Sequence, residues 1–338
     1  MKRKYVCAFV FMLGVHTLLA QDIHFSQFNN TPMAINPALT GLFDGNYRLA
    51  TNYKNQWSAI TNPFSTSYSS FDMNIGKGKK TKGYLNAGLS FFSDKAGKSK
   101  MGTNAIGLNV SYNAKITKTG YLAAGIQSGY IQKSVNLNGL KWDDQYNGSD
   151  YDPNQPTSEA RFGSNTVSTP DFAAGIAYTD QLNEDVKLEV GAAYFHLTKP
   201  SMGFAVKDAL PRKLSTHAKC DYHIKNTNTL IVPTIIYLKQ GSLMEMNVGG
   251  MVKYVLGLDS KYTGENIANS IAFGGLYRSR DAIVLMGSFD YKKYLTVGLS
   301  YDINVSKLTA VTSGRGGIEI AIVYRGVFTK AATASSIE

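Results

Sequence analysis

Cysteine is almost absent from this chain of 338 residues, which has only two. Cys7 lies in an N-terminal stretch that has the features of a cleavable leader, so Cys220 is the single cysteine expected in the mature protein. One cysteine excludes an internal disulfide framework and a zinc site built from cysteine ligands.

Recognisable catalytic patterns are also missing. The sequence has no Gly-x-Ser-x-Gly nucleophile elbow and no phosphate-binding glycine loop. The histidines that follow the leader are isolated from one another, at His24, His196, His217 and His223. Because catalysis needs acid, base or nucleophilic groups that converge, we expect a protein that is not an enzyme and that holds no cofactor.

The apolar stretch from Tyr5 to Leu13 is short for a membrane-spanning helix, which needs about 20 residues. It follows the basic start Met1 to Lys4 and precedes small residues that end at Ala20. This order of basic, apolar and small residues is that of a secretory signal peptide. We therefore expect residues 1–20 to be removed and the protein to be exported.

Positive charge exceeds negative charge, with 35 Lys and Arg against 24 Asp and Glu, for a formal net charge of +11. Lys2, Arg3 and Lys4 leave with the leader, which lowers that charge by three. The one dense basic run, residues 77–82, is flanked by strand patterns, so we interpret it as a solvated turn. A nucleic-acid partner would also conflict with export, and none is expected.

From Tyr47 onward the chain repeatedly alternates apolar and polar residues. Between Ile106 and Ile116, one face carries Ile, Leu, Val, Tyr and Ala, whereas the other carries Gly, Asn, Ser and Lys. Residues two apart lie on the same side of a strand, and strands of about ten residues cross a bilayer when tilted. The pattern predicts fourteen strands, at 47–57, 64–77, 83–94, 104–116, 119–133, 171–180, 186–197, 214–225, 228–239, 243–256, 269–279, 282–291, 293–303 and 315–328.

An even number of amphipathic strands with aromatic residues near their ends is typical of a closed, antiparallel transmembrane β-barrel of the bacterial outer membrane. We therefore predict one barrel over residues 47–328, followed by a polar tail at 329–338. The rival folds are a soluble β-sandwich and a propeller. If the mature chain begins on the periplasmic side, the long connections, above all 134–170, face the exterior, and only 257–268 is long on the periplasmic side.

Residues 21–46 belong neither to the leader nor to the strands. Met33, Ile35 and Leu39 are apolar and suited to burial, and Asn36 before Pro37 biases the chain away from helix. We expect a periplasmic or lumenal plug segment, in which Asn36 and Pro37 fix the position of the backbone.

The long connection 134–170 combines aromatic and acidic residues. Its candidates for partner binding are Trp142, Asp143, Asp144, Tyr146, Tyr151 and Asp152. The acidic residues suggest calcium, but their spacing lacks the twelve-residue loop that ends in Glu. We therefore favour an ordered extracellular loop that touches a partner, with no metal.

Several motifs resemble the PorP/SprF family of outer-membrane proteins, which serve type IX secretion and gliding motility in Bacteroidetes. They are Phe25 to Phe28, Ile35 to Gly41, Tyr53 to Trp57, Asp143 to Tyr146, Tyr151 to Pro153, Pro170 to Ile176 and Tyr301 to Ile320. The resemblance covers nearly the whole chain. It implies a non-enzymatic barrel in contact with outer-membrane lipids and with other secretion components.

Within that family, the resemblance favours the SprF-like role, in which a barrel binds, helps export and anchors an adhesin-like surface protein through the C-terminal domain of that protein. The alternatives are a PorP-like barrel coupled to periplasmic ring components and a passive pore. Charges of both signs on the polar strand faces favour a filled interior over an open channel. They are Lys115, Lys187, Glu189, Glu245, Lys253, Asp290, Asp302, Glu319 and Arg325.

Overall fold

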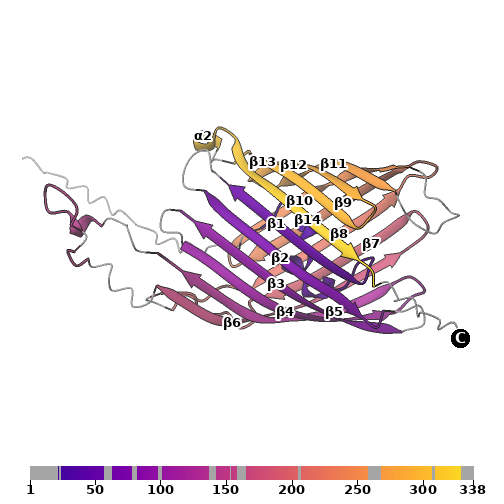
Figure 1. Cartoon of the computed structure of the whole chain (residues 1–338), viewed down its shortest axis with the longest axis horizontal. Coiled ribbons are helices and arrows are strands. Elements are labelled where there is room, and N and C mark those ends of the chain that lie inside the picture. Colours follow the sequence, from indigo (N-terminus) through magenta and orange to yellow (C-terminus); the bar gives the residue numbers. More distant parts are fainter. Residues whose placement is uncertain are drawn as a thin grey trace, which may run out of the picture.

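The computed structural model contains a closed barrel of strands (Figure 1). It describes Asp22 and residues 24–56, 63–77, 82–97, 101–136, 142–152, 154–157, 165–204, 207–257, 268–306 and 309–328. The expected leader (1–20) and tail (329–338), and most of the connection 257–268, lie outside these residues.

Fourteen strands occur in the described part of the chain, and each is antiparallel to its neighbours. Their bounds are β1 Tyr47–Gln56, β2 Phe64–Ile75, β3 Gly83–Ala96, β4 Met101–Lys115, β5 Tyr121–Ser134, β6 Thr166–Gln181, β7 Val186–Phe195, β8 Lys213–His223, β9 Thr229–Gln240, β10 Leu243–Leu256, β11 Asn269–Arg278, β12 Ala282–Tyr291, β13 Leu295–Asn304 and β14 Arg315–Gly326. β1 pairs with β14 from Tyr47 opposite Gly326 to Gln56 opposite Gly317, which leaves no open sheet edge.

The predicted fourteen-stranded antiparallel barrel is therefore confirmed, and the rival sandwich and propeller are wrong. The bounds of β10 and β12 match the expected ranges, whereas β6 begins at Thr166, five residues before the expected start at 171. The extra residues pair with the end of β5. Their sequence, Thr-Val-Ser-Thr-Pro, lacks the clear alternation on which the expectation depended.

Burial alternates along the strands in the opposite sense to that of a soluble protein. In β14, Ile318, Ile320 and Ile322 are exposed on the outside, whereas Glu319 is fully buried on the inside. An outward apolar face and an inward polar face are what a bilayer requires of a barrel.

The two ends of the barrel differ in their connections. One end, which we call the loop end, carries the β5–β6 and β7–β8 connections, 135–165 and 196–212. The other, the turn end, has short connections such as 182–185 and 292–294, and β1 begins there and β14 ends there. In Figure 1, residues 142–152 of the β5–β6 connection lie beyond the ends of the strands.

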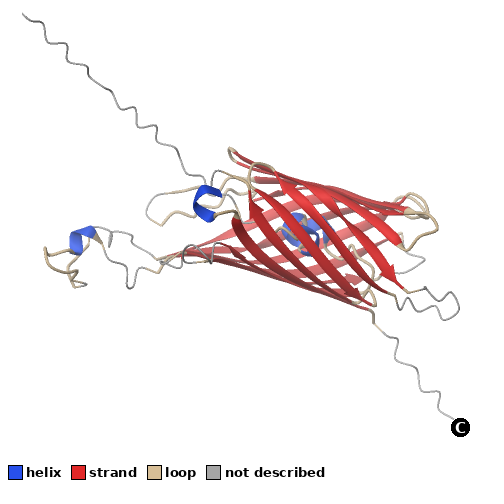
Figure 2. Cartoon of the chain, turned by 90° about the horizontal axis from the view of Figure 1, so that it is seen from above, coloured by secondary structure: helices blue, strands red, loops and turns tan. Residues whose placement is uncertain are grey.

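Residues 24–46, which we call the inner segment, lie inside the barrel (Figure 2). The segment contains three short helices, η1 Phe28–Asn30, α1 Pro32–Ile35 and η2 Pro37–Leu39. Two further short helices, η3 Asp143–Gln145 and α2 Thr309–Thr312, lie in connections at the loop end. Within the described residues, no helix is long and apolar enough to cross a membrane.

The direction of the inner segment differs from the expected course. Asp22 lies at the loop end, against His196 and Gln240, whereas Asn46 lies beside Gly326 at the turn end. The segment therefore runs down the lumen from one opening to the other before β1 begins, and does not start on the turn side. The sequence alone does not indicate this direction, because both ends of the segment are polar.

Candidate functional site

A buried cluster of charges fixes Ser26 and Gln27 of the inner segment to the barrel wall. Glu319 in β14 accepts hydrogen bonds from the backbone N–H groups of Ser26 (2.7 Å) and Gln27 (2.8 Å). The amide of Asn52 in β1 donates to the same carboxylate at 2.8 Å. The inner segment thus contacts the first and last strands at the seam where the barrel closes.

Two cations neutralise this cluster. The ammonium of Lys54 in β1 lies 3.2 Å from Oδ2 of Asp302 in β13, and Arg278 in β11 donates to the same oxygen at 2.9 Å. Ser26 joins them, since its hydroxyl donates to Asp302 Oδ1 at 2.7 Å and accepts from Arg278 Nη2 at 2.6 Å. Buried charges are tolerated only when they are paired and hydrogen-bonded, and these groups satisfy one another.

Asn36 holds the middle of the segment. Its side-chain oxygen accepts from the Ala38 N–H at 2.9 Å, which caps η2, and its amide donates to the Ile176 carbonyl in β6 at 2.8 Å. A side chain at Gly175 would place its Cβ 2.1 Å from this oxygen, so the wall needs glycine there. Pro37 occupies the first position of η2, where its missing N–H costs nothing.

At the turn end, Arg48 and Asp72 receive the last part of the segment. Arg48 Nη2 lies 2.6 Å from Asp72 Oδ2 and donates to the Leu39 carbonyl at 3.1 Å. The Gly41 N–H donates to Asp72 at 2.7 Å, and Gly41 has a φ of 68°, which glycine tolerates best. Met33, Ile35 and Leu39 are all buried, with Met33 fully so.

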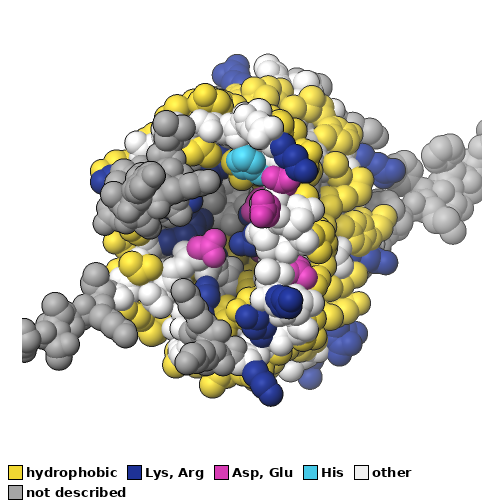
Figure 3. All heavy atoms as spheres, turned by 90° about the vertical axis from the view of Figure 1, so that its right-hand side faces the viewer, with side chains coloured by type: hydrophobic (Ala, Val, Ile, Leu, Met, Phe, Trp, Pro, Cys, Tyr) yellow, Lys and Arg dark blue, Asp and Glu magenta, His cyan; other side chains and the backbone are white. Residues whose placement is uncertain are grey.

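The opening at the turn end is hollowed and carries charges of both signs (Figure 3). Lys253 pairs closely with Asp290, and Lys219 lies 3.6 Å from Asp221. The interior charges expected from the sequence are therefore largely paired with one another or with the inner segment.

At the loop end, His196 lies between two carboxylates. Its Nε2 is 2.8 Å from Asp22 Oδ2, and its Nδ1 is 3.0 Å from Asp171 Oδ2. Burial alone would lower the pKa of His196, but Asp22 and Asp171 raise that pKa to about 9. Lys213, 2.8 Å from Asp22, and the protonated His196 hold the pKa of Asp22 well below its usual value despite burial.

The β5–β6 connection contains a small hairpin, residues 142–152, which holds all six predicted partner-binding residues: Trp142, Asp143, Asp144, Tyr146, Tyr151 and Asp152. Tyr146 and Tyr151 pair across the hairpin with ring centroids 5.2 Å apart, and both rings are exposed. Trp142 is half-buried, and its backbone N–H donates to the side-chain oxygen of Gln145. Within the described residues, no group of three His, Cys, Asp or Glu side chains could hold a metal ion.

Sequence reasoning missed most of the residues that fix the inner segment. Ser26, Gln27 and Lys54 stand out in the sequence only as parts of motifs, and no pattern assigns a role to Arg278 or His196. A sequence signal does exist for Lys54: it occupies a position of the alternating pattern in β1 that faces the interior of the barrel, where a lysine needs a partner of opposite charge.

These features define a class of protein, a membrane-spanning antiparallel barrel whose lumen is occupied by its own N-terminal segment. The chain belongs to the family described as "Type IX secretion system membrane protein PorP/SprF", whose sequence profile matches residues 17–324. It is therefore an outer-membrane barrel of type IX secretion. The choice between an SprF-like and a PorP-like role stays a prediction.

Solved structures with a similar chain course are only distantly related. The toluene transporter TbuX of Ralstonia pickettii is 13% identical, with a TM-score of 0.49, and the match covers 89% of this chain and 94% of that one. The toluene transporter TodX of Pseudomonas putida is 11% identical, with a TM-score of 0.45, over 87% and 92% of the two chains. No curated protein sequence matches this chain.

Proposed function

We propose that this barrel binds a cognate surface protein exported by the type IX route and retains that protein at the cell surface. The loop end provides the contact surface and the inner segment closes the lumen. In this proposal the inner segment, with Met33, Ile35, Asn36, Pro37 and Leu39, is a plug, and Asn36 and Pro37 fix its position without contacting the partner.

The observation that carries the proposal is the attachment of the inner segment along the whole lumen. It is bonded to β13 and β14 at Asp302 and Glu319, to β6 by Asn36, and to Asp72 in β2. A segment that is held in the lumen by so many buried polar contacts fills space that a wide pore would leave open. This arrangement supports a scaffold whose working surface is the loop end.

The hairpin 142–152 suits such a surface. Exposed tyrosines contribute large contact areas at low entropic cost, and the neighbouring carboxylates add polar contacts. The proposal therefore assigns partner binding to Trp142, Tyr146 and Tyr151, with Asp143, Asp144 and Asp152 beside them.

The first experiment removes residues 138–165 and replaces them with a Gly-Ser linker of the same length. The variant should still insert as a heat-modifiable barrel but should release the surface protein into the medium. Full retention of the surface protein would contradict the proposal.

The second experiment addresses the passive pore. Purified protein in a planar bilayer should show no steady conductance, because the inner segment is fixed at three levels of the lumen. Persistent open channels would favour the pore instead.

A further inference from the structure

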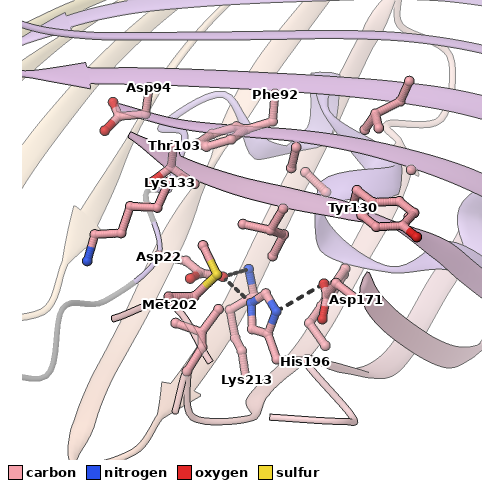
Figure 4. Close-up of a pocket in the computed structure, with 18 of the residues that line it drawn as sticks. Asp22, Phe92, Asp94, Thr103, Tyr130, Lys133, Asp171, His196, Met202 and Lys213 are labelled. Atoms are coloured by element: carbon pink, nitrogen blue, oxygen red, sulfur yellow. Dashed lines mark hydrogen bonds and ion pairs between the residues drawn. The ribbon is translucent and has the colours of Figure 1, made fainter. Parts of the chain in front are cut away.

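A cavity of about 480 Å³ opens at the loop end, between the inner segment and the wall (Figure 4). Its lining comes from the ends of strands β2 to β8 that face the loop end, from the inner segment and from the β7–β8 connection. Its size is that of ordinary ligand pockets. The buried charge cluster around Asp302 and Glu319 does not belong to this lining.

Most of the lining is apolar. Aromatic and aliphatic side chains from three sources meet there: Phe25 and Met33 of the inner segment, Tyr68 and Ile131 of the wall, and Phe195 and Met202 at the β7–β8 connection. The rings of Phe25 and Tyr68 are 6.0 Å apart. Burial of an apolar group against such a surface is favourable without any directional contact.

Apart from Asp208, which is exposed in the β7–β8 connection, the charged groups of the lining have partners. Asp22 accepts from Gln240 as well as contacting His196 and Lys213, and both ring nitrogens of His196 are occupied. Asp171 also lines the cavity, and its Oδ1 is buried and has no hydrogen-bond partner, whereas its Oδ2 contacts His196. Asp94 accepts from the hydroxyl of Thr66, and Lys133 lies over the ring of Phe204. The cavity therefore offers an entering group apolar surface and little unpaired charge.

The β7–β8 connection forms one rim of the cavity. Ser201 and Ala209 pair as an isolated bridge, and the Met202 N–H donates to the Asp208 carbonyl at 2.8 Å. Met202 is buried, so contacts within the connection fix the shape of this rim. The rim and the hairpin 142–152 belong to connections at the same end of the barrel.

We propose that this cavity receives an uncharged, apolar side-chain cluster of the retained surface protein. The inference rests on the proposed function and deepens it, because it adds a hydrophobic anchor point to the polar and aromatic contacts of the hairpin. Buried apolar anchors in preformed pockets dominate the affinity of many protein interfaces.

The test fills the cavity. Ala105 in β4 lines it, so Ala105→Trp should lower the fraction of surface protein retained on cells about tenfold, as expected when an interface anchor is blocked. Ala124→Trp in β5 is the matched control, because Ala124 is exposed on the outer face of the barrel, and it should retain the surface protein fully. Ala96→Trp, at the end of β3, is the second filling variant if Ala105→Trp does not insert as a heat-modifiable barrel.

Retention by an inserted cavity-filled variant would overturn the inference. If removal of 138–165 releases the surface protein while the filled variants retain it, the cavity inference fails and the proposed function stands. If neither change releases the surface protein, both fail.

Discussion

The ammonium of Lys54 and the carboxylate of Asp302 lie 3.2 Å apart in the lumen, and neither side chain is more than 2% exposed. Lys54 belongs to β1 and Asp302 to β13, so the pair spans β14 and its seam with β1. The hydroxyl of Ser26, in the inner segment, accepts a hydrogen bond from Lys54 and donates one to Asp302.

Loss of one partner should be costly. Lys54→Met leaves Asp302 and Glu319 with less compensating charge, and removal of one member of a buried pair typically costs about 3–5 kcal/mol. Guanidinium unfolding of the purified barrel measures this loss. Lys115→Met, at the exposed end of β4, is the control and should change stability little. Equal stability of the two variants would show that the buried pair does not hold the seam.

Asn36→Ala should loosen the inner segment without opening the barrel wall. It removes the cap of η2 and the hydrogen bonds to β6 and β7, which together contribute on the order of 1–3 kcal/mol. Hydrogen exchange of residues 24–46 should become faster, and retention of the surface protein should not change. The control is Asn30→Ala, since the Asn30 amide donates only within the segment. If retention falls in Asn36→Ala while the lumen stays closed, Asn36 itself contacts the partner and does not merely position the segment.

The His196 cluster should make the attachment of Asp22 pH-dependent. The pKa of His196 is about 9 in the folded protein and near 6.5 when unfolded, so its stabilisation is complete below about pH 6.5 and is lost as the pH rises through about 9. Asp22 acts in the opposite sense: its stabilisation is present above its ordinary pKa and is lost only in acid.

The thermal midpoint should therefore fall between about pH 7 and pH 10, by an amount corresponding to at most about 3 kcal/mol. His196→Gln should remove this decrease. A midpoint that falls equally in both proteins would place the alkaline titration elsewhere.

The tyrosine pair should matter to the partner and not to the barrel. Tyr146→Ala with Tyr151→Ala removes two exposed rings from a hairpin outside the membrane, so unfolding of the barrel should be unchanged within about 0.5 kcal/mol. Affinity for the surface protein should drop at least tenfold in a binding assay with its isolated C-terminal domain. The exposed pair Tyr53→Ala and Tyr277→Ala, on the outer faces of β1 and β11, controls for loss of aromatic residues in general. Unchanged affinity in the hairpin variant would remove the tyrosines from the interface.

Much of the wall was predictable from the sequence because alternation is a local signal. β10 and β12 match their expected bounds, and apolar and polar residues alternate clearly in β10 from Met244 to Val248. The expected burial of Met33 and Leu39 likewise follows from their apolar side chains. The course of the inner segment was not predictable. It depends on pairs distant in sequence, such as Ser26 with Glu319 and Asp22 with His196, and no local pattern links such residues.

The most direct test of the central claim is an affinity purification from outer membranes, with the intact barrel and the variant that lacks residues 138–165 compared in parallel. The account predicts that an exported surface protein co-purifies with the intact barrel and is missing with the variant. Recovery of periplasmic ring components with both proteins, and of no surface protein with either, would contradict it.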